Sequence, residues 1–314
     1  MKHPSLPNLV ERLRSDDADA RRAALIELDD EFDLITIALL RPLLEDDDAA
    51  VRQLSIRFLQ EAGDVDAIPF ILRATVDEDP AVAAAARAAL QEFRTRDAIE
   101  PLLNGVKDPD STVRAAAIAA LRTMRNPQTI PALKRAAEDL SAAVRREALL
   151  ALAEMRDAAL LPVLRQGLYD EESSVRRVAI GIVGLFRSAE TFHDLRRAFR
   201  DRDGEVRLEV VRALRQFPGS APVSLLVSAL GDLHLPVVEE AIASLGKLRA
   251  PASTRIARFL RHAQPRLRIS AALALGEIGD HRSQSRLTAL RDDPDAGVAR
   301  AAWRAGDRLE ANAA

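Results

Sequence analysis

The chain has 314 residues, a formal net charge of −3, 30% charged and 4% aromatic residues, and no cysteine. The lack of cysteine excludes disulfides, zinc–thiolate centres and cysteine nucleophiles, and the small net charge gives no global attraction to nucleic acid or anionic lipid. Residues 1–7 contain no apolar leader, and no apolar run is long enough to span a membrane, so we expect a cytoplasmic protein.

One motif recurs along the whole chain and predicts its organisation. It consists of Asp, four further residues, Val and Arg. Its Val position falls, in chain order, at Val51, Val82, Val113, Val144, Val175, Val206, Val237, Leu267 and Val298. Every interval is 31 residues except the 30 between Val237 and Leu267, and a step back from Val51 reaches Ala20. Such a fixed period predicts about ten repeat units in a single domain over residues 1–314.

Each unit contains two predicted helices and no strand pattern. The first helix begins at an apolar–Pro pair, as at Ile68-Pro69 and Ile130-Pro131, because proline fits the first turn of a helix. The second begins near the Val position, and its apolar residues recur with the helical period. Capping residues lie three positions before the Val: Asp17, Asp48, Asp79, Asp110, Ser141, Asp203 and Asp295. These features predict an all-α, right-handed α-solenoid of two-helix units.

The motif Asp-x4-Val-Arg-x2-Ala-x3-Leu resembles the bacterial HEAT-like repeats of phycobilin lyases, which have an armadillo-type fold. The resemblance covers residues 5–310 and implies the fold, whereas many unrelated activities use such solenoids. The sequence lacks the His-Glu metal motifs of the di-iron hydroxylases that are built on HEAT repeats. It also contains no recognised nucleophile or phosphate-loop motif. We therefore expect no enzyme activity and no metal or other cofactor.

The Asp and Arg columns of the motif have two interpretations. The arginines that follow the Val position are a candidate ladder for binding phosphates. Alternatively, Asp and Arg pair with each other and join the turn of one unit to the helix of the next. Because both columns recur in step with the repeat, the structural interpretation is favoured.

The candidate binding surface is the exposed side of the second helices, which lines the concave side of HEAT solenoids. Counted from the Val position, residues +2, +6 and +9 are predicted to point away from the core. These columns do not repeat and hold small or apolar residues beside arginines. The candidate contact residues are Arg57, Ala84, Ala88, Ala115, Ala119, Arg122, Arg146, Leu150, Arg177, Leu208, Arg212, Arg215, Ile269 and Leu273. An apolar strip beside arginines fits a protein or peptide partner, helical and with acidic flanks.

The 30-residue step coincides with departures from the motif. His262 replaces the Asp, Gln264 replaces the acidic cap, and Val238 of the preceding unit replaces the Arg. We expect the curvature of the solenoid to change between units eight and nine.

Three functions compete. The favoured hypothesis is a protein-binding scaffold or adaptor that uses the concave surface. The alternative suggested by the resemblance is a chromophore-handling protein similar to phycobilin lyase subunits, although the chain offers one Tyr and one Trp. The least favoured hypothesis is a nucleic-acid-binding protein similar to HEAT-like DNA glycosylases. Such a protein needs a basic surface, whereas acidic residues outnumber basic ones here by 48 to 45.

Overall fold

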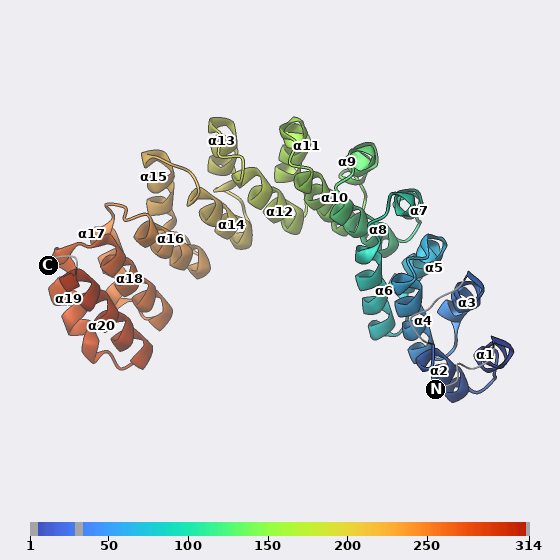
Figure 1. Ribbon diagram of the computed structural model, residues 1–314. Helices are drawn as coiled ribbons and strands as arrows, with labels where there is room; N and C mark the ends of the chain where they lie inside the picture. The colour runs from blue at the N-terminus through green and yellow to red at the C-terminus, as the bar shows by residue number, and fades with distance from the viewer. Residues whose placement is uncertain (1–5, 29–33, 312–314) are drawn as a thin grey trace. The chain divides into compact units, whose positions relative to one another are not determined.

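The computed structural model describes residues 6–28 and 34–311, and every regular element in these residues is helical. Residues 1–5, which belong to the N-terminal segment expected to lack a leader, lie outside the described part. The helices form ten successive pairs, which confirms the predicted all-α repeat fold. The chain divides into two larger compact parts, residues 1–163 and 164–314. They are called the N-terminal unit and the C-terminal unit below, whereas the numbered units are the two-helix repeats. Within each compact part the helix pairs follow one another as a stack (Figure 1). A single domain over residues 1–314 stays a prediction.

The first helices of the pairs are short, and several continue as 3-10 turns. Their bounds are α1 (Leu6–Leu13), α3 (Leu34–Leu40), α5 (Ile68–Arg73), α7 (Ile99–Gly105), α9 (Ile130–Ala136), α11 (Leu161–Gln166), α13 (Ala189–Ala198), α15 (Ser220–Ala229), α17 (Ser253–Ile256) and α19 (Gln284–Ala289). The 3-10 turns η1 (Arg41–Glu45), η3 (Ala74–Val76), η7 (Gly167–Tyr169), η8 (Ala257–Arg261) and η10 (Leu290–Asp292) extend α3, α5, α11, α17 and α19. The predicted Pro starts are confirmed in α5 and α9.

The second helices are longer and lie beside one another in one layer of each unit (Figure 1). They are α2 (Ala18–Ile26), α4 (Ala49–Glu61), α6 (Pro80–Glu92), α8 (Ser111–Met124), α10 (Ala142–Glu154), α12 (Ser173–Gly184), α14 (Gly204–Leu214), α16 (Leu235–Lys247), α18 (Pro265–Ile278) and α20 (Ala296–Ala311).

Capping residues start the second helices where the sequence predicts them. The Asp48 carboxylate accepts a hydrogen bond from the Val51 amide at 3.0 Å. Asp79, Asp110 and Asp203 do the same for the first turns of their helices. Ser141 also occupies the N-cap position, but its side chain forms no capping bond. A carboxylate at this place satisfies free amides and faces the positive end of the helix dipole.

Within each compact part, the core lies between the two helices of each pair and between successive pairs. In α10, Val144, Ala148 and Leu152 repeat at a spacing of four residues, and each is fully buried. Removing such aliphatic side chains from water is the main favourable contribution to folding. The predicted inward face of the second helices is therefore confirmed.

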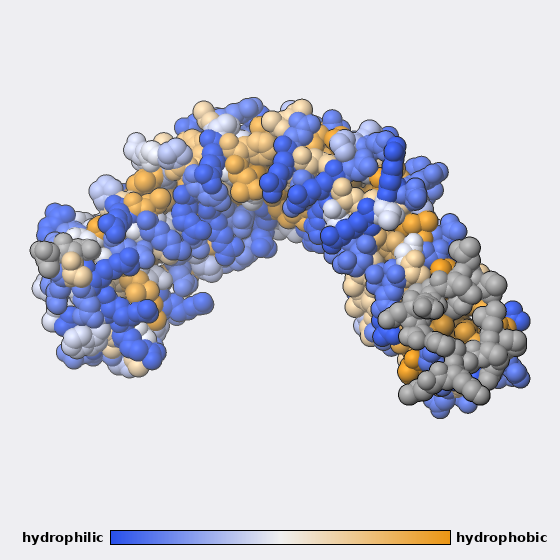
Figure 2. Space-filling model, in the orientation of Figure 1, coloured by the Kyte–Doolittle hydropathy of each residue, from blue (hydrophilic) through white to orange (hydrophobic). Residues whose placement is uncertain are grey.

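The outer surface is mainly polar. Figure 2 shows hydrophilic side chains over most of the visible face, with hydrophobic residues exposed in patches between them. None of the helices in residues 6–28 and 34–311 is both long and apolar enough to cross a membrane.

Candidate partner-binding surface

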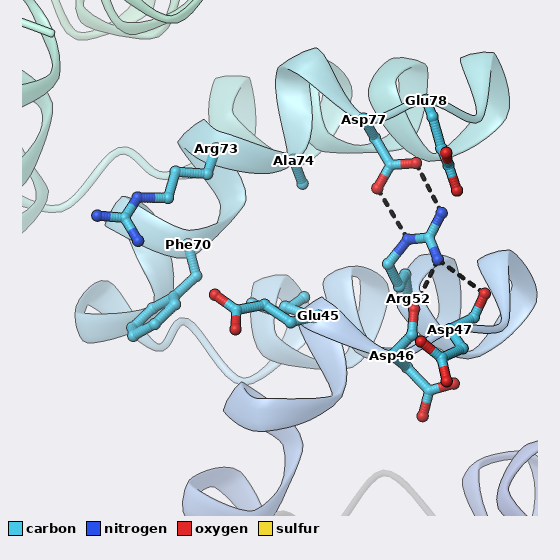
Figure 3. Close-up of a pocket in the computed structure, with 10 residues that line it drawn as sticks. Glu45, Asp46, Asp47, Arg52, Phe70, Arg73, Ala74, Asp77 and Glu78 are labelled. Carbon is cyan, nitrogen blue, oxygen red and sulfur yellow. Dashed lines mark hydrogen bonds and ion pairs between the residues drawn. The ribbon is translucent and has the colours of Figure 1, made fainter.

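The Asp–Arg ladder is the most regular set of charged side chains. Arg52 of α4 donates from Nε and Nη2 to the two carboxylate oxygens of Asp77, at 2.8 and 2.7 Å (Figure 3). Its Nη1 also donates to the carbonyl oxygens of Asp46 and Asp47. The Arg52 and Asp77 side chains are only 8% and 11% exposed. Arg52 therefore joins the turn of its own unit to the turn of the following unit.

The same pair recurs between residues 25 positions apart. Further pairs are Arg21–Asp46, Arg114–Asp139, Arg176–Asp201, Arg207–Asp232 and Arg268–Asp293. Burial tends to raise the pKa of the Asp77 carboxyl, but hydrogen bonds from Arg52 and the Asp79 amide hold it below its usual value. The hollow of about 380 Å³ beside this pair is lined by five carboxylates and two arginines, which does not suit a phosphate. The pairing of Asp with Arg between units is confirmed, but its direction is the reverse of the predicted one: the arginine helix of one unit binds the turn of the following unit.

One position in the N-terminal unit interrupts the ladder. Ala83 of α6 stands where seven of the ten units have the arginine, and Asp108 lies 25 residues further on. Ala83 is 6% exposed, and the Asp108 carboxylate still accepts the Asp110 amide at 2.9 Å. The acceptor half of the pair is therefore in place without its donor.

We expect the substitution Ala83→Arg to complete this pair and to raise the free energy of unfolding by about 1 kcal/mol, as for a charge-assisted, two-point hydrogen bond. Urea denaturation followed by circular dichroism measures the change. In an Asp108→Asn background the same substitution should give little or no gain. An equal gain in both backgrounds would show that the arginine acts without Asp108.

Between units eight and nine both halves of the pair are replaced together. Val238 occupies the arginine position of α16, and His262 occupies the aspartate position of the next turn. His262 Nδ1 accepts a hydrogen bond from the Gln264 amide at 3.1 Å, as an aspartate oxygen does in the other turns. The turn therefore keeps its local hydrogen bond while the inter-unit ion pair is absent. The predicted change of curvature at this step stays a prediction.

The small and apolar candidate contact residues of the N-terminal unit lie on three neighbouring second helices. Ala84 and Ala88 of α6 are exposed, and Ala115 and Ala119 of α8 are partly exposed. Leu150 of α10 is also partly exposed. The structure thus brings together a strip of small and apolar side chains across α6, α8 and α10.

The arginines beside this strip share an acidic partner. Arg122 of α8 lies 3.3 Å from Glu147 of α10, and Arg146 lies 3.8 Å from the other oxygen of the same carboxylate. The Glu147 side chain is 18% exposed and the two arginines 31% and 41% exposed. These arginines are therefore partly neutralised within the protein.

A similar network crosses the second helices of the C-terminal unit. Arg212 of α14 lies 3.3 Å from Glu209 and 3.8 Å from Glu240 of α16, and Arg215 lies 3.4 Å from Glu240. Together with Gly181 of α12, these residues border a small hollow of about 170 Å³. The network contains both arginines and glutamates, and its ion pairs connect the neighbouring helices α14 and α16.

The sequence analysis missed the glutamates of these networks. Glu147 and Glu240 occupy position +3 of their helices, a column that was not considered. Arg122 and Glu147 are 25 residues apart, as are Arg215 and Glu240. This is the separation of the Asp–Arg ladder, so a search for charge pairs at that spacing would have found them.

Two of the predicted orientations were wrong. Leu208 of α14 is only 6% exposed, because α12 and α16 pack on both sides of α14 and cover a leucine at the margin of its face. Position +9 points toward the following unit, and in units two to nine its residues are buried or only partly exposed. Gly184, Gly246 and Gly276 occupy it and are buried, each close to an alanine of the next second helix.

The remaining candidate residues lie apart from these networks. The Arg57 guanidinium lies 3.7 Å from Glu61 and 4.6 Å from the centre of the Phe58 ring. Arg177 of α12 is exposed. On α18, Ile269 is partly exposed and Leu273 is 38% exposed.

The described residues contain no cluster of three or more His, Asp or Glu side chains placed to hold a metal ion. Several charged groups of the second helices instead pair with each other, as Arg122 does with Glu147 and Arg215 with Glu240. The surface of the second helices therefore presents small side chains and a few exposed aliphatic groups to a partner.

Comparisons with known proteins agree with this architecture. A family profile described as HEAT repeats matches overlapping segments from residue 6 to residue 305. Yeast importin-beta (Kap95p) is similar in structure, with a TM-score of 0.68, 16% identity, and coverage of 98% of this chain and 51% of that one. Kap95 in its complex with Nup1 gives a TM-score of 0.65 at 15% identity, with 97% and 52% covered. The chain therefore spans about half the length of importin-beta. No curated protein matches the sequence.

Proposed function

Because the chain belongs to the HEAT-repeat family, we propose that it is a protein-binding scaffold without catalysis of its own. The proposed contact surface is the strip on α6, α8 and α10 formed by Ala84, Ala88, Ala115, Ala119 and Leu150, called the alanine strip below. A cytoplasmic location belongs to the same proposal.

The observation that carries the proposal is the combination of exposure and small size in the alanine strip. Alanine side chains let a partner helix approach closely, and Leu150 adds an aliphatic contact at one border. A helical partner with an apolar face fits this surface. Since Arg122 and Arg146 already share Glu147, packing rather than acidic flanks is proposed to supply most of the affinity.

The fold itself supports protein binding. Yeast importin-beta, which has the same architecture, forms a complex with Nup1 and binds RanGDP. Leu273 and the partly buried Ile269 give the C-terminal unit a second, smaller apolar patch on α18. We propose that this patch contributes to partner binding separately from the alanine strip.

The test compares proteins captured from native lysate by the wild-type chain and by two single variants. Leu150→Glu places a charge at the border of the alanine strip, and Ala159→Glu places the same charge at an exposed site in the 3-10 turn Ala158–Leu160 before α11. We expect one or more proteins to bind the wild type and Ala159→Glu but to be lost with Leu150→Glu, as measured by quantitative mass spectrometry. Identical captured sets for all three chains would contradict the proposal. Ile269→Glu tests the patch on α18 in the same way.

A further inference from the structure

A long segment of the C-terminal unit lacks acidic residues. Residues 241–276 contain no Asp or Glu, whereas 48 acidic residues in 314 correspond to about five or six in 36. The same segment carries seven cations: Lys247, Arg249, Arg255, Arg258, Arg261, Arg266 and Arg268. It includes the turn of unit nine, where His262 and Gln264 replace two acidic residues of the motif. The loss of these carboxylates leaves an excess of positive charge in the segment, although Arg266 and Arg268 still pair with Glu239 and Asp293 outside it.

The structure gathers part of this charge around a groove between two first helices. The groove has a volume of about 660 Å³ and lies between the α17–η8 segment and the α19–η10 segment. Arg258 and Arg261 line one side and Arg286 the other, and all three side chains are exposed. None of these guanidinium groups is paired with a carboxylate of the described residues. Nearby Arg268 and Arg282, by contrast, bind Asp293 and Asp280.

The other walls of the groove are apolar or carry hydroxyl groups. Ala257 and Leu260 are 8% and 4% exposed and form its floor, and Ala289 and Leu290 line the opposite side. The hydroxyl-bearing residues Thr254 and Ser285 are exposed in the lining. The lining contains no aromatic residue and no acidic residue.

We propose that this groove, formed by α17–η8 and α19–η10, binds an acidic peptide segment that also carries apolar side chains. Arginine pairs with carboxylates through two parallel hydrogen bonds, and three unpaired guanidinium groups around one groove match several carboxylates at once. The floor accepts an aliphatic side chain, and the hydroxyl groups can bond to peptide backbone. Single-stranded nucleic acid is disfavoured because its binding relies on aromatic side chains that stack on bases.

This site is separate from the surface of the proposed function. The groove lies on first helices, whereas the alanine strip lies on second helices of the N-terminal unit. The result of the peptide-binding experiment on the groove is therefore independent of the result of the lysate experiment on the alanine strip.

The experiment measures the fluorescence anisotropy of a labelled twelve-residue peptide, four copies of Glu-Glu-Leu, titrated with the full chain at low ionic strength. We expect saturable binding that weakens strongly at about 0.5 M salt, where charges are screened within a few ångströms. The double variant Arg258→Glu/Arg261→Glu should weaken binding at least tenfold, because like charges then face the peptide. A peptide with serine in place of leucine should bind more weakly than the original.

The matched control is Arg300→Glu/Arg304→Glu, which makes the same change of charge at exposed positions of α20. We expect it to bind the peptide within twofold of the wild type, and both double variants to keep the wild-type melting temperature. Equal weakening by the two double variants would overturn the proposal, since net charge alone would then explain binding. Absence of peptide binding would also overturn it. So would tighter binding of a twelve-nucleotide oligothymidine that depends on the same two arginines.

Discussion

Replacing Arg52 with methionine is expected to lower the free energy of unfolding by about 3 kcal/mol, the usual cost of removing one partner from a buried ion pair. The aliphatic part of the side chain is kept, so the loss comes from the four hydrogen bonds that Arg52 donates to Asp77, Asp46 and Asp47. The Asp77 carboxylate would stay buried between two turns without a cation. Urea denaturation followed by circular dichroism measures the change.

A double-mutant cycle separates the ion pair from other effects. Asp77→Asn keeps an oxygen that can accept the Asp79 amide, a bond of 2.9 Å in the wild type, and removes only the charge. We expect a coupling energy of at least about 1.5 kcal/mol between the two substitutions. The matched control is Arg57→Met in the same helix, whose exposed partner Glu61 lies 3.7 Å away and should contribute less than about 0.5 kcal/mol. Equal losses from Arg52→Met and Arg57→Met would show that the ladder does not hold the turns together.

The ladder was predictable because both of its residues recur with the repeat. A fixed period places every Arg at the same position of its helix and every Asp at the same position of its turn. One correct pair therefore implies the others. The exceptions to the ladder are of two kinds. Ala83 leaves Asp108 without its donor, whereas Val238 and His262 remove both halves of a pair.

The second-helix surface was only partly predictable. Helical periodicity indicates which residues face the core, but it does not tell which side of a helix meets the preceding unit and which meets the following one. Position +9 was therefore assigned to solvent although it faces the next helix, and Leu208 was placed on the surface although its neighbours cover it. Glu147 was missed for the same reason, because its role depends on a cation in the preceding unit.

The basic groove was missed for a different reason. The net charge of −3 describes the whole chain and hides a segment with no acidic residue. The breaks in the motif at His262 and Gln264 were interpreted as a change of geometry, whereas the same replacements also change the local charge. Charge counted in windows of about one repeat would have located residues 241–276 from the sequence.

A pair of glycine substitutions should give opposite effects on stability within the same layer of helices. Glycine in a helix costs about 1 kcal/mol relative to alanine, so Gly→Ala stabilises wherever there is room for a methyl group. At Gly181 of α12 the only heavy atom within 4 Å of an added Cβ is a Glu209 side-chain oxygen at 3.4 Å, outside the helix's own backbone. We therefore expect Gly181→Ala to raise the free energy of unfolding by about 0.5 to 1 kcal/mol.

At Gly276 of α18 the same substitution is expected to destabilise by about 2 kcal/mol, because an added Cβ would lie 2.8 Å from the Cα and 2.9 Å from the Cβ of Ala305 in α20. The Cα cannot move without moving the helix, so α18 and α20 would have to separate and lose packing along their whole contact. Gly246 of α16 meets the Cα of Ala274 at 2.7 Å and should respond like Gly276. Thermal and urea denaturation of the three single variants measure these effects. If Gly276→Ala stabilised the protein as much as Gly181→Ala, the close approach of the second helices would not be what requires glycine at position +9.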